Sequence, residues 1–399
     1  MDMILAGTVG LLIVAILVAL AARRLALPYT VGLVVAGIAL AWAKVPLGPK
    51  LTHDFIYLVI LPPLLFEAAI SIHWKELRQD LVPVLVLSTL GVVISAVVVA
   101  GGMVWLVGWA LAPAIVFGVL IAATDPVAVI AMFKDLGVKG RLRLLVESES
   151  LANDGVAAVL FALALAWALA PQTSPGILSS VLALVTSAGG GIAVGLAVGA
   201  AAIALAGRTA DHLIAAALTT VAAYASFLLA ERLHLSGVLA TVAAGLLIGN
   251  VTALGPRLRN TFSAEERDFI MGFWEFAAFI ANSVVFLLIG LAVASIPFAG
   301  LGAATLVVAI LLVLLGRLLT VYPLCLMFAG SRWAMSLGEQ HVLWWGGLRG
   351  ALALALALSL PPSLAYADEI RIAAFAVVIF SVVVQGLTMP LLLRKLGKA

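Results

Sequence analysis

The stretch that decides the fold is residues 113–133, PAIVFGVLIAATDPVAVIAMF, in which Thr124-Asp125-Pro126 interrupts an otherwise apolar run. An apolar run of about 20 residues is long enough to cross the hydrocarbon core of a bilayer as a helix. Pro126 has no backbone N–H and disfavours helical geometry at Asp125, so we expect the helix to unwind there. Unwound backbone at membrane depth is tolerated where it lines a cavity. The freed carbonyls suit a cation, and Asp125 is placed to cap the half-helix N-terminus that follows.

The composition extends this interpretation to the whole chain. Hydrophobic residues make up 65% of the 399 residues and charged residues 10%, against about 45–50% and about 25% in soluble domains. We therefore expect an all-α polytopic membrane protein with one integral membrane domain over residues 1–399. Cys325 is the only cysteine, which excludes an intrachain disulfide and a cysteine metal cluster. The sequence contains no nucleotide-binding G-x-x-x-x-G-K-[ST] loop, and we expect no cofactor and no nucleic-acid partner.

Apolar runs between charged or Pro/Gly breaks predict thirteen membrane spans. They lie near residues 3–22, 28–43, 54–72, 81–108, 113–133, 145–170, 176–206, 213–230, 235–250, 269–292, 300–329, 340–360 and 370–393. With the N-terminus outside, sixteen Lys and Arg residues face the cytoplasm and four face outward, while Arg317 and Arg349 lie inside spans. The positive-inside rule therefore predicts an N-out, C-in orientation.

The twelfth span carries a second break, at Gly346-Gly347-Leu348-Arg349-Gly350. It lies seven spans after the first break, so the two broken helices run in opposite directions. This arrangement predicts two inverted halves, residues 1–170 and 213–393, whose broken helices cross at matching positions. Paired broken helices of this kind indicate a secondary transporter with its site between the halves.

Several ionisable residues lie deep within the predicted spans. Each costs about 2.5–3.5 kcal/mol on insertion scales and therefore needs a partner or a task. At about 1.5 Å per residue, the depths of Glu67, Asp125, Asp154 and Arg349 place all four near one layer in mid-membrane. The sequence therefore predicts that these side chains meet.

The sixth span separates two kinds of polar residue by helical phase. Ser150 and Asp154 are four residues apart and share one face, which predicts oxygen ligands for a hard alkali cation. Glu149 and Asn153 share the adjacent face, where Glu149 is free to pair with a base such as Arg349. Because one carboxylate holds a proton or a metal ion but not both, Asp154 alone is sufficient for obligatory exchange.

Short motifs occur in order from the third span to the twelfth. They are Phe66-Glu67, Ala123-Thr124-Asp125-Pro126-Val127-Ala128-Val129, Glu149-Ser150-Leu151-Ala152-Asn153-Asp154-Gly155, Phe273-Trp274-Glu275-Phe276, Asn282-Ser283-Val284-Val285-Phe286 and Trp345-Gly346-Gly347-Leu348-Arg349-Gly350-Ala351. Together they resemble the sodium/proton antiporters of the NhaP/NHE branch of the monovalent cation:proton antiporter superfamily. Ser148 departs from a glycine common in this family, and we expect the chain to lack the large cytoplasmic tail of animal exchangers.

The resemblance implies a transporter, not an enzyme, that exchanges Na⁺ or the similar Li⁺ for H⁺ in the cell membrane and supports pH homeostasis. It implies a homodimer with a dimerisation part and a six-helix core that moves like an elevator. Asp154 would be the principal ion carboxylate, with Ser150, Glu67 and Thr124 as further Na⁺ ligands and Asp125 acting through water. Asn153 stands where a related branch has a second acid, which predicts electroneutral exchange. The resemblance also implies that Glu149 pairs with Arg349, and we expect a structural role for Arg317.

Three alternatives stay open at this point. A K⁺/H⁺ antiporter of the same fold has the same ligands, because selectivity depends on the size of the cavity. A cation channel also uses broken helices but does not need a carboxylate that trades a proton for an ion. An intramembrane protease would use Asp125 and Asp154 as a dyad, but Asp125 lacks the G-x-G-D setting expected for one.

Overall fold

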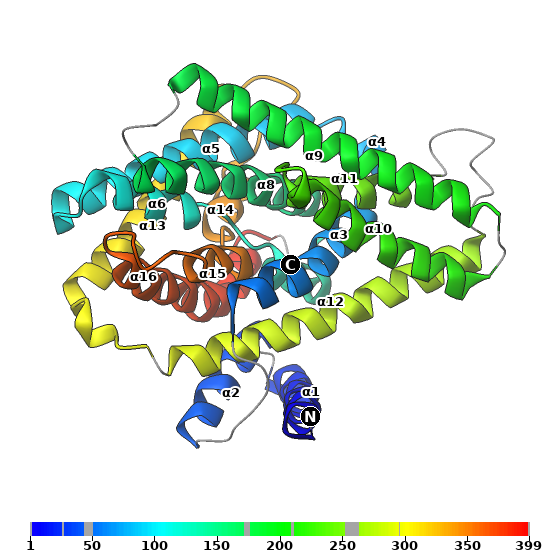
Figure 1. Ribbon diagram of the computed structural model, residues 1–399, viewed down its shortest axis with the longest axis horizontal. Coiled ribbons are helices and arrows are strands. Elements are labelled where there is room, and N and C mark those ends of the chain that lie inside the picture. The colour runs from blue at the N-terminus through cyan, green and yellow to red at the C-terminus, as the bar shows by residue number, and fades with distance from the viewer. Residues whose placement is uncertain are drawn as a thin grey trace.

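The chain was analysed as a computed structural model, which describes residues 2–25, 28–43, 51–170, 176–208, 211–251, 263–294 and 296–397. Within these ranges the protein is entirely helical (Figure 1). The α-helices are α1 (Asp2–Leu25), α2 (Tyr29–Trp42), α3 (Leu61–Ser71), α4 (Trp74–Leu77), α5 (Leu81–Gly102), α6 (Leu111–Leu120), α7 (Val127–Leu136), α8 (Arg141–Leu169), α9 (Ile177–Ala206), α10 (His212–Arg232), α11 (Gly237–Gly249), α12 (Ala264–Val293), α13 (Ala303–Met327), α14 (Leu337–Trp345), α15 (Ala351–Leu358), α16 (Ala367–Phe380) and α17 (Gly386–Lys395). Three π-helical turns, η1 (Phe55–Ile60), η2 (Met103–Val107) and η6 (Ser381–Gln385), adjoin α3, α5 and α17, and a 3₁₀ turn, η5 (Phe298–Gly300), precedes α13.

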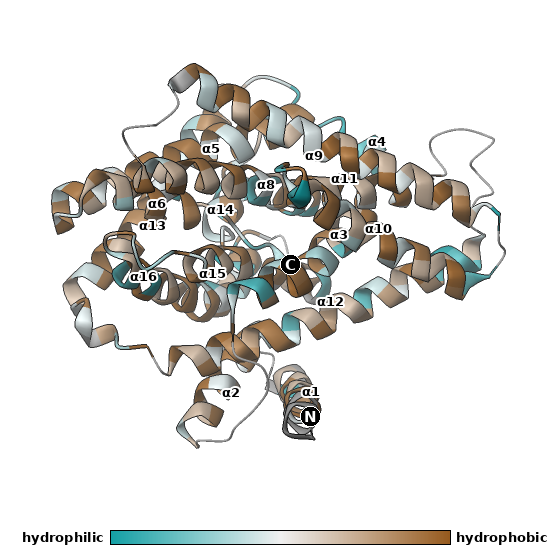
Figure 2. Cartoon of the chain, viewed as in Figure 1, coloured by the Kyte–Doolittle hydropathy of each residue, from teal (hydrophilic) through white to brown (hydrophobic). Residues whose placement is uncertain are grey.

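Hydrophobic residues predominate along the long helices (Figure 2). In the described ranges, seven helices are long and apolar enough to cross a membrane, and five shorter apolar helices accompany them. Every predicted span falls on a helix or on a pair of consecutive helices. The count of thirteen crossings and the N-out orientation stay predictions. Five basic residues of the orientation count lie outside the described residues: Lys44, Lys50, Arg257, Arg259 and Lys398.

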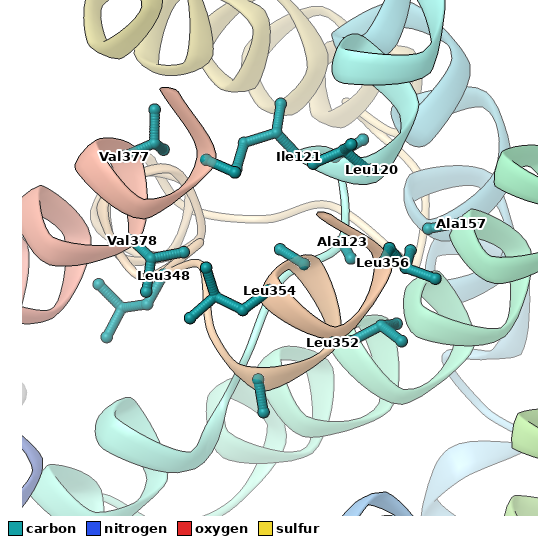
Figure 3. Close-up of a cluster of buried hydrophobic side chains, with 14 of the residues drawn as sticks. Leu120, Ile121, Ala123, Ala157, Leu348, Leu352, Leu354, Leu356, Val377 and Val378 are labelled. Atoms are coloured by element: carbon teal, nitrogen blue, oxygen red, sulfur yellow. The ribbon is translucent and has the colours of Figure 1, made fainter. Parts of the chain in front are cut away.

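Both predicted helix breaks are confirmed. The fifth span is divided into α6 and α7 by residues 121–126, and the twelfth into α14 and α15 by residues 346–350. The two unwound segments cross in contact, since the backbone N–H of Asp125 donates to the carbonyl of Leu348 at 2.7 Å. Buried side chains from both breaks and from α16 surround the crossing (Figure 3). The breaks therefore meet inside a packed apolar core.

The helices form two groups. In the core bundle (α5–α8 and α13–α17), α5 packs against α6, α8 and α13. In the panel (α1–α3 and α9–α12), α11 packs against α3, α9 and α10, and α12 packs against α2 and α3. Glycine permits the closest approach within the panel, because a Cβ on Gly195 of α9 would lie 2.0 Å from the Ala240 carbonyl oxygen of α11. The core bundle contains six of the predicted spans, the number expected for the core.

Candidate ion-binding site

Asp125 lies where two half-helices begin. Its carboxylate accepts a hydrogen bond from the backbone N–H of Val127 at 2.9 Å, at the start of α7. It also faces the backbone N–H of Ala351, at the start of α15. Gly350 makes this approach feasible, because a Cβ there would lie 1.8 Å from Asp125 Oδ2. One carboxylate therefore faces the positive ends of two helix dipoles, which extends its predicted capping role to the second broken helix.

Arg349 binds backbone carbonyls at the end of α6, the half-helix that precedes the first break. It is 1% exposed, and its guanidinium donates to the carbonyls of Ala122 at 2.5 Å and Ala123 at 3.0 Å, just beyond the end of α6. Among the described residues no carboxylate lies within ion-pair distance of it. The predicted Glu149–Arg349 ion pair is therefore wrong. The physical reason is that carbonyls freed by the break bind the guanidinium instead.

The partner of Glu149 is Arg317 of α13. The two side chains form a bidentate ion pair with N–O distances of 2.7 and 2.8 Å, and both residues are buried. Arg317 also donates to the carbonyl of Leu343 at 3.1 Å, near the end of α14. Gln385, in the π-helical turn η6, donates to the Trp345 carbonyl at 3.0 Å. The end of α14 is thus stabilised by side chains from α13 and η6. The contacts of Arg317 with Glu149 and with the Leu343 carbonyl agree with the structural role expected for it.

Four predicted site residues line one cavity of about 230 Å³: Glu67, Thr124, Asp125 and Asp154. Asp154 is 8% exposed. Across the described ranges its carboxylate has neither a hydrogen bond nor an ion pair, although it is influenced by the charges of Asp125, Glu149 and Arg349. The structure therefore brings together the acids that sequence depth had placed in one layer.

The other two predicted site residues, Ser150 and Asn153, form hydrogen bonds with the Thr124 hydroxyl. The hydroxyls of Thr124 and Ser150 are 3.1 Å apart, and Asn153 Nδ2 donates to Thr124 Oγ1 at 3.2 Å. Neither Ser150 nor Asn153 lines the cavity. The side-chain amide oxygen Oδ1 of Asn153 is buried and has no partner among the described atoms. These contacts fix the Thr124 oxygen at the edge of the cavity, next to Asp125.

Three further charged residues line the same cavity although the sequence did not single them out as ligands. Lys134 and Glu275 form an ion pair at 3.0 Å, with side chains 44% and 67% exposed, which marks an accessible mouth. Glu147 is buried and lies 3.7 Å from Arg143. The sequence could have indicated that Glu147 lines the cavity, because residues seven apart on a helix, such as Glu147 and Asp154, share a face. The sequence held no comparable signal for the Lys134–Glu275 pair.

The donor set of the cavity suits a weakly held alkali cation. Carboxylate and hydroxyl oxygens are hard ligands. In the described part of the chain, no group of three or more His, Cys, Asp or Glu residues is arranged to hold a resident metal ion. Two buried oxygens with no bonding partner there, on Thr30 and Asn282, belong to residues that line the cavity. The cavity is therefore lined by oxygen donors of the kind that alkali cations prefer.

Comparison with known proteins agrees with the fold and the motifs. The model of the family described as "Sodium/hydrogen exchanger, transmembrane" matches residues 10–395. The Na(+)/H(+) antiporter ApNhaP of Aphanothece halophytica is 40% identical over 372 residues, which cover 93% of this chain and 70% of that protein. The low-affinity Na(+)/H(+) antiporter NhaS1 of Synechocystis is 39% identical over 384 residues, with the same coverage of 93% and 70%.

A solved structure supports the architecture. The sodium proton antiporter MjNhaP1 from Methanocaldococcus jannaschii superposes with a TM-score of 0.76 at 21% identity, over 99% of each chain. Its all-helical fold matches the one described above. The relatives are transporters, consistent with the expectation that the chain is not an enzyme. The chain is therefore a multi-pass membrane protein that belongs to the transmembrane sodium/hydrogen exchanger family, among the NhaP-type antiporters.

Proposed function

We propose that the protein exchanges Na⁺ for H⁺ across the cell membrane, and that the two ions compete for the Asp154 carboxylate. One observation carries this proposal: Asp154 is buried at the wall of a cavity, and its carboxylate has no hydrogen-bond or ion-pair partner among the described residues. A buried unpaired carboxylate is strongly disfavoured, so a proton or a cation must neutralise it. Competition for one carboxylate couples the two ions. The names of the relatives support Na⁺ as the cation, and Li⁺ is expected to share the site.

The predicted site residues in and beside the cavity each have a proposed role. Asp154 provides the charge, and Thr124 and Glu67 complete the ligand set together with water. Ser150 acts mainly by holding the Thr124 hydroxyl, which is 3.1 Å from its own. Asn153 does the same through its amide, and it orients the site without titrating. Asp125 acts through water while its carboxylate caps the half-helices.

The division into two helix groups supports an elevator-like movement. Asp154 belongs to the core bundle, while Glu67 lies on α3 of the panel, which packs against α11 and α12. A shift of the core bundle along the panel would carry Asp154 from one side of the membrane to the other. We propose that the panel also forms the contact of a homodimer, and that the thirteen spans lie N-out and C-in. In that orientation, the mouth at Lys134 and Glu275 faces the cytoplasm.

The test is ion-driven proton movement in proteoliposomes containing a pH-sensitive dye. Adding Na⁺ or Li⁺ should move protons, and Asp154→Asn should abolish this signal because asparagine neither releases a proton nor supplies a charge. Glu76→Gln is the matched control, since Glu76 is an exposed acid on α4. Its exchange should be unchanged. Melting temperatures measured for both variants check that the fold is retained.

Each contrary result identifies an alternative. Sodium-dependent proton movement by a folded Asp154→Asn protein would overturn the role of Asp154. A response to K⁺ alone would make the protein a K⁺/H⁺ antiporter. Single-channel conductance without coupled proton movement would make it a channel.

A further inference from the structure

A second crevice, of about 540 Å³, lies on the core bundle and shares no lining residue with the ion cavity. It is formed where the end of α13, the second half of α14 and the end of α17 meet. The predicted orientation places the ends of α13 and α17 at the cytoplasmic face, so the crevice runs from that face toward the second break. The described residues that line it include aromatic side chains, two bases and no acid.

The wall of this crevice is aromatic, and most of its polar atoms are already bonded within the protein. Trp344 Nε1 donates to the Leu314 carbonyl at 3.1 Å, and Trp345 Nε1 donates to the Thr388 hydroxyl at 2.8 Å. The Tyr322 hydroxyl and His341 Nδ1 are 2.6 Å apart. The rings of Trp344 and Trp345 are 5.3 Å apart. Because these contacts hold the ring positions and satisfy these polar atoms, the wall offers a fixed apolar surface.

The rim of the crevice is basic. Arg394 and Lys395 occupy the last turn of α17 and are exposed. Over the described residues, neither side chain has a hydrogen bond or an ion pair. Leu391, which lines the crevice, is 59% exposed, and Leu326, four residues after Tyr322 on α13, is 72% exposed. Two unneutralised positive charges therefore stand at the end of an apolar crevice.

We propose that this crevice binds one anionic phospholipid of the cytoplasmic leaflet. The phosphate would pair with Arg394 and Lys395, and an acyl chain would lie against Trp344, Trp345 and Leu391. Basic pockets between membrane helices on the cytoplasmic side attract anionic headgroups, and aromatic side chains favour the interface. A free phosphate would leave the apolar wall uncovered, which is why a lipid fits better. The site does not depend on which cation the protein exchanges.

Lipid counting by native mass spectrometry tests the site directly. Purified protein in detergent is titrated with phosphatidylglycerol or with phosphatidylcholine of the same acyl chains. We expect Arg394→Ala/Lys395→Ala to weaken phosphatidylglycerol binding roughly thirtyfold, because each base near an anionic lipid contributes about 1 kcal/mol. Phosphatidylcholine should bind weakly to both proteins. Equal binding of the two lipids to the unchanged protein would overturn the proposal.

Two matched variants separate charge from position. Lys75→Ala/Arg78→Ala removes the same charge from exposed residues in and just after α4, and should leave phosphatidylglycerol binding unchanged. Arg394→Lys/Lys395→Arg keeps the charge and should restore binding. Equal loss in both alanine variants would mean that binding follows net charge and not this crevice. Displacement of the lipid by soluble glycerol phosphate would identify a free-phosphate site instead.

A spectroscopic measurement covers the case in which a variant fails to fold. Phosphatidylglycerol brominated on its acyl chains should quench the tryptophan fluorescence of the unchanged protein. Trp344→Phe/Trp345→Phe should lose a measurable part of that quenching, because these two rings form the wall. The same quenching in both proteins would place the acyl chain elsewhere and overturn the proposal.

Discussion

The two helix breaks are stabilised in opposite ways. The first contains a proline and carries an acid, Asp125, which faces the helix N-termini at Val127 and Ala351. The second is rich in glycine and carries a base, Arg349, which binds carbonyls at the end of α6, in the first broken helix. Each break thus places a charge on the other's helix. The crossing is therefore one unit. Asp125 faces the starts of α7 and α15, and Arg349 binds the end of α6. The end of α14 is stabilised from outside the crossing, by Arg317 and Gln385.

The largest expected effect concerns the support that the second break receives from outside the crossing. Arg317→Ala removes the partner of buried Glu149 and one donor to the Leu343 carbonyl. An uncompensated buried charge costs about 3–5 kcal/mol. We therefore expect a large loss of unfolding free energy, measured as thermal or denaturant stability in detergent.

A double-mutant cycle checks which arginine is the partner. Glu149→Gln/Arg317→Gln should recover part of the stability lost in Arg317→Ala, because neither partner then carries a buried charge. The cycle of Glu149 with Arg349 should show a smaller coupling energy, since no ion pair joins them. A larger coupling with Arg349 would restore the pairing first expected from the sequence.

The second-largest expected effect concerns Arg349, the charged residue of the second break that binds backbone carbonyls at the first break. Arg349→Ala removes hydrogen bonds to the carbonyls of Ala122 and Ala123. We expect a loss of about 2–3 kcal/mol in unfolding free energy, because hydrogen bonds from a charged donor contribute about 1.5–3 kcal/mol each and partial relaxation recovers some. Arg349→Lys should lose less. Unchanged melting temperatures in both variants would show that the carbonyls have other partners.

Much of the crossing could be predicted from the sequence. Pro126 and the glycines at 346, 347 and 350 signal interrupted helices, because proline and glycine disrupt regular hydrogen bonding. Counting residues along the spans placed Asp125 and Asp154 at one depth, and both line one cavity. Depth and spacing are properties of a single helix, so they can be taken from one sequence.

Contacts between helices could not be predicted in the same way. Helical phase showed that Glu149 points away from the face of Asp154, but two arginines, Arg317 and Arg349, were available as its partner. The choice depends on which backbone carbonyls the breaks expose, and therefore on how α6 and α14 pack. The approach of Lys134 and Glu275 at the cavity mouth likewise depends on tertiary packing between α7 and α12.

The third effect concerns the close contact between the two breaks. Gly350→Ala would place a Cβ 1.8 Å from Asp125 Oδ2. We expect a loss of about 2 kcal/mol, within the range for overpacking, because the Asp125 carboxylate can turn away but its Cβ, 2.4 Å from the added atom, cannot. Gly272→Ala is the control, because Gly272 lies in α12 with nothing within 4 Å. That variant should be neutral or slightly stabilising. Equal stability of the two variants would refute the contact.

The smallest expected effect is that of membrane potential on exchange, which should be absent. Because Asp125 and Arg349 carry opposite charges and Glu149 is paired with Arg317, the fixed charges of the crossing cancel. In the proposed moving bundle, Asp154 is then the carboxylate that the transported ions share, and either H⁺ or Na⁺ neutralises it. Asn153 cannot titrate, and Glu67 lies on the panel, which stays in place in the proposed movement.

Exchange of one proton for one cation should therefore be electroneutral. One net charge moved per cycle would couple to the voltage by about 2.3 kcal/mol per 100 mV, a bias large enough to measure. The measurement is the exchange equilibrium in proteoliposomes whose potential is clamped with valinomycin and K⁺ gradients, with the Na⁺ and pH gradients held fixed. An equilibrium independent of the potential agrees with cancelled charges at the two breaks. An equilibrium that shifts with the potential means that a further charge moves, and Glu67→Gln then tests whether Glu67 carries it.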